Sequence, residues 1–325
     1  MPTTVPTLDL RTWQSATATE RKQIAMELDG ALQQTGMFLL GGHDIPADLT
    51  ERIRAQGRDF FRMPVRDKRK YSVDRPYDNG WRGLGKLQVG AIYGEKNAPD
   101  LHEAYHVGPT HQTGVASHDE LYYPPNKWPS EVPQLQKAAT EYTAHMVRVA
   151  LQVLEVFAEV LNLRQDFFSS QADHATWTQN VNWYPSLKAV GRVADGQMRV
   201  GPHSDYGTLT LLDRQKGKGG LQVWNEQDDW FTPPHEPGML AVLLGDLMNL
   251  WTDGRWRALR HRVLAPPPDA PDEELVSLVF FFEANPEARI VPLAAPVGGG
   301  AGMSPALAGE TILEKVGVSV TLAEK

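Results

Sequence analysis

The sequence contains no cysteine among its 325 residues. This absence excludes disulfide bonds, thiolate zinc sites, iron–sulfur clusters and a cysteine nucleophile. Any metal site in the chain must therefore be built from His, Asp or Glu side chains. A chain without cysteine is also typical of a reducing compartment, and we expect the protein to be cytoplasmic.

Long apolar runs and clustered positive charge are scarce as well. The longest apolar stretch, Leu275–Phe282, has eight residues, whereas a helix needs about 20 to cross a bilayer. Residues 1–6 lack the basic start and apolar run of a secretion signal. The net charge of −8 argues against sequence-independent binding of nucleic acid, which needs clustered Lys and Arg. We therefore expect neither a membrane nor a nucleic acid as a partner, and no pattern indicates an oligomeric state.

Helix and strand signals alternate in the first part of the chain. Apolar residues recur every four positions from Ile24 to Leu32 and predict a helix from about Thr19 to Gln34. A longer apolar stripe predicts a helix over Leu135–Leu161 that braces one side of a sheet. We expect residues 1–130 to form an N-terminal α/β region and residues 131–325 to form the long helix and a β-rich core.

Short β-rich runs dominate the chain after about Trp177, with Gly, Pro, Asn and Asp between them. Many short strands separated by turns are typical of a sandwich or jelly roll. We therefore predict a mainly β fold with flanking helices and a jelly-roll core. The predicted strands are Gln179–Tyr184, Met198–His203, Thr208–Leu212, Gly220–Val223, Met239–Leu244, His261–Leu264 and Leu275–Phe282.

The segment Arg199–Leu212, which spans two of these runs, holds a His-x-Asp pair, His203 and Asp205. Positions i and i+2 of a strand face the same side, so an imidazole nitrogen and a carboxylate oxygen can reach one metal ion. His261, from a distant strand, is our candidate for the third ligand. Two histidines and one carboxylate leave open coordination positions, which suits Fe(II) that must also bind O2 and a cosubstrate. Other histidines, such as His106, lack a partner at ligand spacing, and we expect them to be structural or exposed.

Further motifs occur in the same order as in a known family. The chain resembles the isopenicillin N synthase-like branch of the Fe(II)/2-oxoglutarate-dependent oxygenases over almost its whole length. The matching segments are residues 5–10, 35–46, 60–64, 68–71, 79–83, 103–108, 126–129 and 182–185, followed by the Gly-Thr-Leu-Thr run at 207–210, Gly245-Asp246 and His-Arg-Val at 261–263.

This resemblance implies a double-stranded β-helix core and a set of functional residues. His203, Asp205 and His261 match the iron ligands of the family, and Asn182 and Tyr184 match residues that line the cosubstrate site. Ser277 matches the serine of an Arg-x-Ser pair, which holds the distal carboxylate of 2-oxoglutarate, or a substrate carboxylate in the oxidase that names the branch. The implied activity is oxidation of a small molecule by O2, as hydroxylation, desaturation or cyclisation.

The chain departs from the family at Leu275, which stands where the arginine of Arg-x-Ser is expected. A buried carboxylate needs a cation or several hydrogen-bond donors. Another cation can hold 2-oxoglutarate; Arg199 is a candidate because it has the same strand parity as His203, and Arg192 and Lys188 are further candidates. Alternatively, the protein is a 2-oxoglutarate-independent Fe(II) oxidase, or a non-catalytic protein that binds a metal or small molecule.

Three further residues are candidates for contact with the substrate. Arg82 lies in the glycine-rich segment Gly80–Gly85, which borders the substrate in the resembled family. Phe280 and Phe282 share one face of a predicted strand and could wall the pocket, although core packing also explains them.

Overall fold

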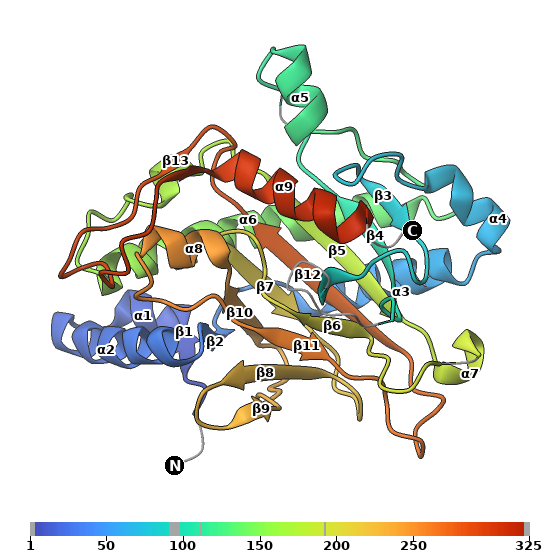
Figure 1. The fold of residues 1–325 in the computed structure, drawn as a ribbon, viewed down its shortest axis with the longest axis horizontal. Coiled ribbons are helices and arrows are strands. Elements are labelled where there is room, and N and C mark those ends of the chain that lie inside the picture. The colour runs from blue at the N-terminus through green and yellow to red at the C-terminus, as the bar shows by residue number, and fades with distance from the viewer. Residues whose placement is uncertain (1–3, 91–97, 111, 192, 322–325) are drawn as a thin grey trace.

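The computed structural model describes residues 4–90, 98–110, 112–191 and 193–321 of the chain. Two mainly antiparallel sheets form its centre, and the smaller sheet lies in front of the larger one in Figure 1. The larger sheet has the strand order β1 (Thr7–Asp9), β2 (Met37–Gly41), β10 (Leu240–Leu244), β7 (Leu209–Asp213), β12 (Leu275–Phe282), β5 (Trp177–Tyr184), β4 (Glu103–Val107) and β3 (Gly80–Arg82). The smaller sheet has the order β6 (Val200–His203), β11 (His261–Val263), β8 (Leu221–Asn225) and β9 (Asp229–Phe231).

This architecture is the mainly β fold with flanking helices that the strand pattern predicted. The predicted strand Leu275–Phe282 is β12 at the same bounds, and β10 begins one residue later than predicted. Among the strands that the structure describes, β1 and β2 pair in parallel, and the other paired strands of the two sheets are antiparallel.

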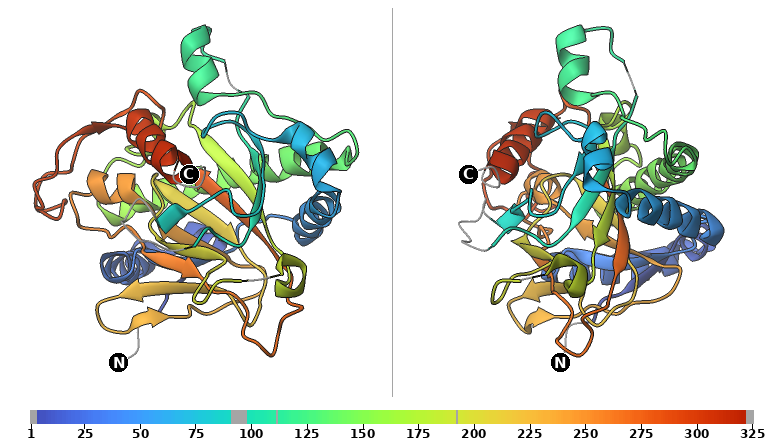
Figure 2. Two further views of the ribbon diagram at one scale, coloured as in Figure 1. Left: turned by 45° about the vertical axis from the view of Figure 1, so that its right-hand side comes forward. Right: turned by 90° about the vertical axis from the view of Figure 1, so that its right-hand side faces the viewer.

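Helices cover the larger sheet on the side away from the smaller one. The longest, α6 (Gln134–Val160), packs with α3 (Ala47–Phe61) and α2 (Ala18–Gln34). Figure 2 (right) shows α3 and α6 on one side of the sheet and α9 (Ala308–Thr321) on the other. The shorter elements are α1 (Leu10–Ser15), α4 (Val65–Lys68), η1 (Arg69–Tyr71), α5 (Ala116–Tyr122), η3 (Ser169–Gln171), α7 (Leu187–Val190), α8 (Asp246–Trp251) and the strand pair β13 (Arg289–Ile290) and β14 (Ala306–Leu307).

Local sequence explains where α2 begins and ends. Thr17 and Glu20 form a capping box at its first turn, which satisfies two backbone N–H groups. The chain leaves the helix through Gly36 at φ +78°, where a Cβ would lie 2.1 Å from the carbonyl oxygen of Arg257. Only glycine fits this conformation and this approach. The predicted helix Thr19–Gln34 is therefore confirmed to within one residue.

Strands from both predicted regions share the larger sheet. From residues 1–130, β2 pairs with β10 and β4 pairs with β5. The division at residue 130 stays a prediction, because the sheet itself is continuous across it. Among the described residues, no helix combines the length and the apolar character needed to span a bilayer.

Candidate metal centre and active site

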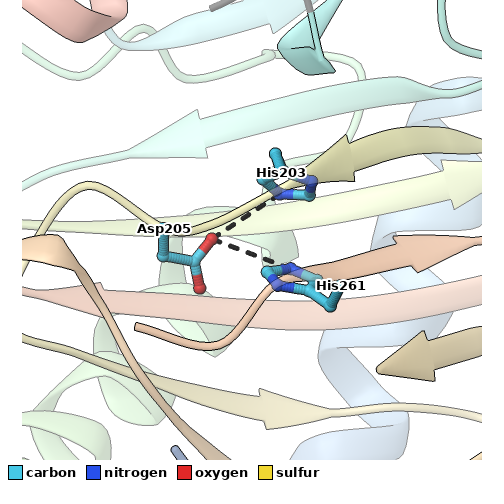
Figure 3. A group of neighbouring side chains, drawn as sticks. All are labelled: His203, Asp205 and His261. Atoms are coloured by element: carbon cyan, nitrogen blue, oxygen red, sulfur yellow. Dashed lines mark ion pairs between the residues drawn. The ribbon is translucent and has the colours of Figure 1, made fainter. Parts of the chain in front are cut away.

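His203, Asp205 and His261 lie together where the smaller sheet faces the larger one. His203 ends β6 and His261 begins β11, and the two residues are direct cross-strand partners. Their rings lie 4.1 Å apart between centroids. The Nε2 atoms of His203 and His261 lie 3.6 and 3.8 Å from Oδ1 of Asp205, as the dashed lines in Figure 3 show. All three side chains are buried.

Backbone carbonyl groups fix which imidazole nitrogen is available. Nδ1 of His203 donates to the oxygen of Gly201 at 2.9 Å, and Nδ1 of His261 donates to that of Leu259 at 3.0 Å. In this tautomer both Nε2 atoms carry lone pairs, and both face Asp205. Burial lowers the pKa of His203 well below its ordinary value, and the neighbouring His261 lowers it further. A neutral imidazole is the form that binds a metal ion.

The carboxylate of Asp205 is oriented by two neighbouring elements. Its Oδ2 accepts a hydrogen bond from Oγ1 of Thr210 on β7 at 2.6 Å, and its other carboxylate oxygen, Oδ1, faces the two histidines. The first residues of α8 hold its backbone, because the N–H of Asp246 donates to the oxygen of Asp205 at 2.9 Å. The turn before α8 requires Gly245: a Cβ there would lie 2.2 Å from the oxygen of Gly207.

This donor set fits an Fe(II) ion of the non-haem type. One ligand atom from each of the three residues lies within 4.8 Å of the others, so all three can reach one ion. Two imidazoles and one carboxylate leave positions for a cosubstrate and O2. The arrangement is the one that the sequence predicted from the His-x-Asp pair and His261.

The predicted cosubstrate residues also lie side by side. Ser277 of β12 pairs with Asn182 of β5, and Tyr184 lies two residues after Asn182 on the same strand. Burial raises the pKa of Tyr184 above its ordinary value, so the phenol keeps its proton. Oδ1 of Asn182 is buried and has no partner among the described residues. An unpaired buried polar atom is costly, and a bound polar ligand would satisfy it.

Arg199 is buried beside this group. Its guanidinium carbon lies 5.4 Å from the ring centroid of Tyr184, and its side chain is 1% exposed. Nη1 donates to Glu273 at 2.7 Å and Nη2 donates to the backbone oxygen of Glu273 at 2.9 Å. Nε is buried without a partner in the described part of the chain. The structure thus brings a cation next to Leu275, whose side chain packs with Tyr184 and Val200.

Strand parity alone does not explain the position of Arg199. His261 pairs with His203, but Val263 pairs with Val200, so β6 contains one extra residue between these pairs. Such a bulge breaks the strict alternation of faces on which the sequence prediction rested. The other candidate cations lie elsewhere: Lys188 is exposed and pairs with Asp272, and Arg192 lies outside the described residues.

A cavity of about 220 Å³ opens above His203 and Asp205. Arg82 lines it, as predicted for a substrate-contacting residue, and donates to Nδ1 of His106 and to the backbone oxygen of Pro76. Nε2 of His106 is buried without a partner among the described residues. Helix α9 contributes one wall of the cavity, through Ile312, Leu313 and Val316.

The prediction that Phe280 and Phe282 wall the pocket is wrong for this cavity. Side chains of β12 alternate, and these two point to the helix-covered face, where they are fully buried in the apolar core. Phe281 faces the cavity instead, on the same side of the strand as Ser277. The correct face could have been read from Ser277, because residues two and four positions apart share a side.

Most of the residues that line the cavity were not identified from the sequence, and His106 and Glu283 are two that carry chemistry. His106 was expected to be structural or exposed, and it is half-buried in β4 at the cavity wall. Glu283 follows β12, continues the face of Ser277 and Phe281, and lines the same cavity. The parity of β12 was the one available signal for Glu283, whereas ligand spacing carries no information about His106.

Comparisons with known proteins agree with this geometry. Residues 5–131 match the family described as non-haem dioxygenase in morphine synthesis N-terminal, and residues 178–284 match the 2OG-Fe(II) oxygenase superfamily. Validamycin A dioxygenase of Streptomyces hygroscopicus subsp. limoneus is 60% identical over 97% of this chain and 86% of its own. Homoarginine-6-hydroxylase 2-ODD-C23 of Glycine max is 27% identical over 83% of this chain and 80% of its own.

Solved structures share the fold. The full-length Neurospora crassa protein T7H, in complex with alpha-KG, superimposes with a TM-score of 0.83 at 21% identity and covers 96% of this chain and 95% of its own. JOX2, in complex with 2OG, Fe and JA, gives a TM-score of 0.75 at 25% identity and covers 95% of this chain and 83% of its own. With the matched families and the 60% identical relative, these findings show that the chain belongs to the 2OG-Fe(II) oxygenase superfamily and is a 2-oxoglutarate-dependent, non-haem Fe(II) dioxygenase of a small molecule.

Proposed function

We propose that this enzyme hydroxylates validamycin A or a close chemical relative of it. The observation that carries the proposal is the 60% identity over 97% of the chain to a validamycin A dioxygenase, together with the cavity above His203 and Asp205. The reaction consumes O2 and 2-oxoglutarate and releases succinate and CO2. When bound, the iron and 2-oxoglutarate supply the oxidising power, and the protein supplies position and a shielded cavity.

We assign a separate role in this reaction to each group of residues in the site. His203, Asp205 and His261 hold the metal ion, and Thr210 orients the carboxylate of Asp205. Asn182, Tyr184 and Ser277 provide hydrogen-bond partners for 2-oxoglutarate. The wall formed by α9 limits the access of water to the reacting bond. Arg82, which also lines the cavity, contacts the substrate.

The activity is tested with purified protein, Fe(II), 2-oxoglutarate, O2 and validamycin A. We expect a product that is heavier by one oxygen atom, labelled from ¹⁸O2, and one succinate for each product molecule. A product lacking two hydrogens would instead indicate desaturation or cyclisation. Succinate formation that validamycin A does not stimulate would overturn the proposed substrate.

We propose that Arg199 takes the role of the family's Arg-x-Ser arginine, whose position is occupied by Leu275 in this chain. Glu273 and its backbone carbonyl occupy the two Nη atoms and hold the guanidinium against Tyr184, which leaves the buried Nε for a carboxylate. A charge-assisted hydrogen bond is worth about 1.5–3 kcal/mol. This contribution corresponds to roughly ten- to a hundred-fold in affinity for 2-oxoglutarate.

The test is anaerobic titration of the Fe(II)-loaded protein with 2-oxoglutarate, followed through the visible charge-transfer band of the chelate. We expect Arg199→Ala to raise the dissociation constant by roughly ten- to a hundred-fold without loss of iron. The double variant R199A/L275R should recover part of this affinity, because it restores the arrangement of the resembled family. Lys188→Ala, an exposed partner of Asp272, is the matched control and should change nothing.

Two results would contradict this assignment. If Arg199→Ala binds 2-oxoglutarate as the parent does, another residue holds the distal carboxylate. If the parent protein keeps iron but shows no chelate band, the described residues do not hold 2-oxoglutarate in the proposed way.

The cellular compartment is also part of the proposal. We infer a cytoplasmic enzyme because the cysteine-free chain and an Fe(II) cofactor both suit a reducing compartment. Fractionation of the producing cells, with the protein detected by antibody, tests this inference.

A further inference from the structure

Glu283 places a buried carboxyl group in the substrate cavity. It lines the same cavity as His203 and Asp205 and is 8% exposed. Its carboxylate occupies the space that a side chain at Gly207 would need, because a Cβ there would lie 1.6 Å from Oε2. The backbone N–H of Thr208 donates to Oε2 at 2.8 Å. Oε2 is therefore tied to the turn after Asp205, and Oε1 remains for a ligand.

No cation compensates this carboxyl group in the described part of the chain. Glu283 forms no ion pair there, and its hydrogen-bond donor is the backbone N–H of Thr208. Arg82, the cation of the cavity wall, is engaged with His106 and Pro76, and Lys315 pairs with Asp246. Burial, with Asp205 acting in the same direction, raises the pKa of Glu283 to about 8. A buried carboxylate without a partner is unfavourable, so a positive ligand group would be strongly preferred at this point.

We propose that Glu283 recognises a positively charged amine nitrogen of the substrate through Oε1, and so makes the cavity selective for small ammonium compounds. This inference rests on the proposed function, in that the cavity is taken as the substrate site. The alternative role for Glu283 is purely structural, since its bond to Thr208 also holds the turn that carries Asp205. Glutamine separates the two roles, because its amide oxygen can still accept from Thr208 but carries no charge.

The test uses two probes of similar shape, cyclohexylamine in its ammonium form and cyclohexanol. Each is titrated into the anaerobic protein with Fe(II) and 2-oxoglutarate, and binding is followed as a change in the visible chelate band. We expect the parent protein to bind the ammonium probe at least about tenfold more tightly than the alcohol. Glu283→Gln should abolish this preference while the dissociation constant of 2-oxoglutarate stays the same. Glu287→Gln, an exposed carboxyl group paired with His174, is the matched control and should keep the preference.

The outcomes separate this inference from the proposed function. Equal binding of both probes by the parent protein, or a preference that survives in Glu283→Gln, would overturn the recognition role. The first of these results needs no variant, so it holds even if Glu283→Gln folds poorly. Failure of validamycin A to react, with the ammonium preference intact, would overturn the proposed substrate and leave the role of Glu283 standing.

Discussion

At the scale of single residues, hydrogen bonds around the metal ligands determine which atoms can bind. Backbone oxygens accept hydrogen bonds from Nδ1 of His203 and of His261, and Oγ1 of Thr210 donates a hydrogen bond to one oxygen of Asp205. Each ligand therefore presents one atom to the centre before any ion is bound. Because the ligand side chains are already ordered, metal binding costs less conformational entropy.

Thr210→Val tests this ordering. The variant removes the 2.6 Å hydrogen bond to Oδ2 of Asp205 while the side-chain volume is nearly unchanged. We expect the affinity for Fe(II) to fall by roughly ten- to a hundred-fold. Anaerobic competition with a chelator of known affinity measures the change.

A matched control lies two residues earlier. Oγ1 of Thr208 is buried without a partner among the described residues, so Thr208→Val removes no hydrogen bond. We expect this control to bind iron as the parent does. An equal loss of affinity in both variants would mean that volume or shape in this strand, and not the bond to Asp205, controls the centre.

The same scale shows what the sequence could and could not predict about the site. His203 and Asp205 were recognisable from their His-x-Asp spacing, although β6 ends at His203 and Asp205 lies in the loop that follows it. Arg199 was reached by a parity argument that the bulge in β6 invalidates, although the residue is indeed buried beside Tyr184. For Glu283 the only local signal was its parity with Ser277 and Phe281 on β12. Its importance arises from the pairing of β12 with β7 and from the missing side chain at Gly207.

At the scale of elements, the pattern of apolar residues predicted the helices and strands well, but it did not predict which strands pair. The helix Leu135–Leu161 and the strand Leu275–Phe282 were recovered because each has many buried apolar positions in a regular period. The three-residue strands β3 and β9 contain too few positions to show a period. The order of strands in the larger sheet depends on contacts between distant segments, which no local window contains.

The turn between β10 and α8 positions the metal-binding loop at this scale. Gly245→Ala would place a Cβ 2.2 Å from the backbone oxygen of Gly207, and neither backbone can move freely. We expect a loss of about 1–3 kcal/mol in the free energy of unfolding, together with weaker iron binding, because the loop from Asp205 to Gly207 must shift. Urea unfolding of the metal-free protein and an iron titration measure the two effects.

Gly30→Ala is the same chemical change as Gly245→Ala, but we expect it to stabilise the protein. Gly30 lies inside α2, and a Cβ there would have nothing within 4 Å. Alanine should stabilise the protein by about 0.5–1 kcal/mol through helix propensity, with no effect on iron. A destabilisation equal to that of Gly245→Ala would show that the loss at Gly245 is not steric.

At the scale of the whole molecule, the last described helix closes a site built by the two sheets. Helix α9 crosses the side of the larger sheet opposite α3 and α6 (Figures 1 and 2). Its apolar residues Ile312, Leu313 and Val316 line the cavity. The metal ligands come from the smaller sheet and the loop that follows β6, while the cosubstrate residues come from the larger sheet. The cavity is thus complete only when both sheets and α9 are in place.

Lys315 connects α9 to the metal-binding loop. It forms an ion pair with Asp246, which also accepts from Oγ of Ser204 and donates its N–H to Asp205. Lys315→Ala should loosen α9 without disturbing iron or 2-oxoglutarate. Because the pair is about a quarter exposed, we expect a contribution of about 0.5–1 kcal/mol, or a two- to fivefold rise in the KM of the substrate.

The ratio of succinate to hydroxylated product separates closure from simple binding. A loosened α9 admits water and lets 2-oxoglutarate be consumed without substrate oxidation, so this ratio should rise above that of the parent. Lys218→Ala is the matched control, since Lys218 pairs with Asp269 at 2.7 Å on the exposed surface, and it should leave both KM and the ratio unchanged. A Lys315→Ala enzyme with a higher KM but an unchanged ratio would mean that α9 contacts the substrate without shielding the reaction from water.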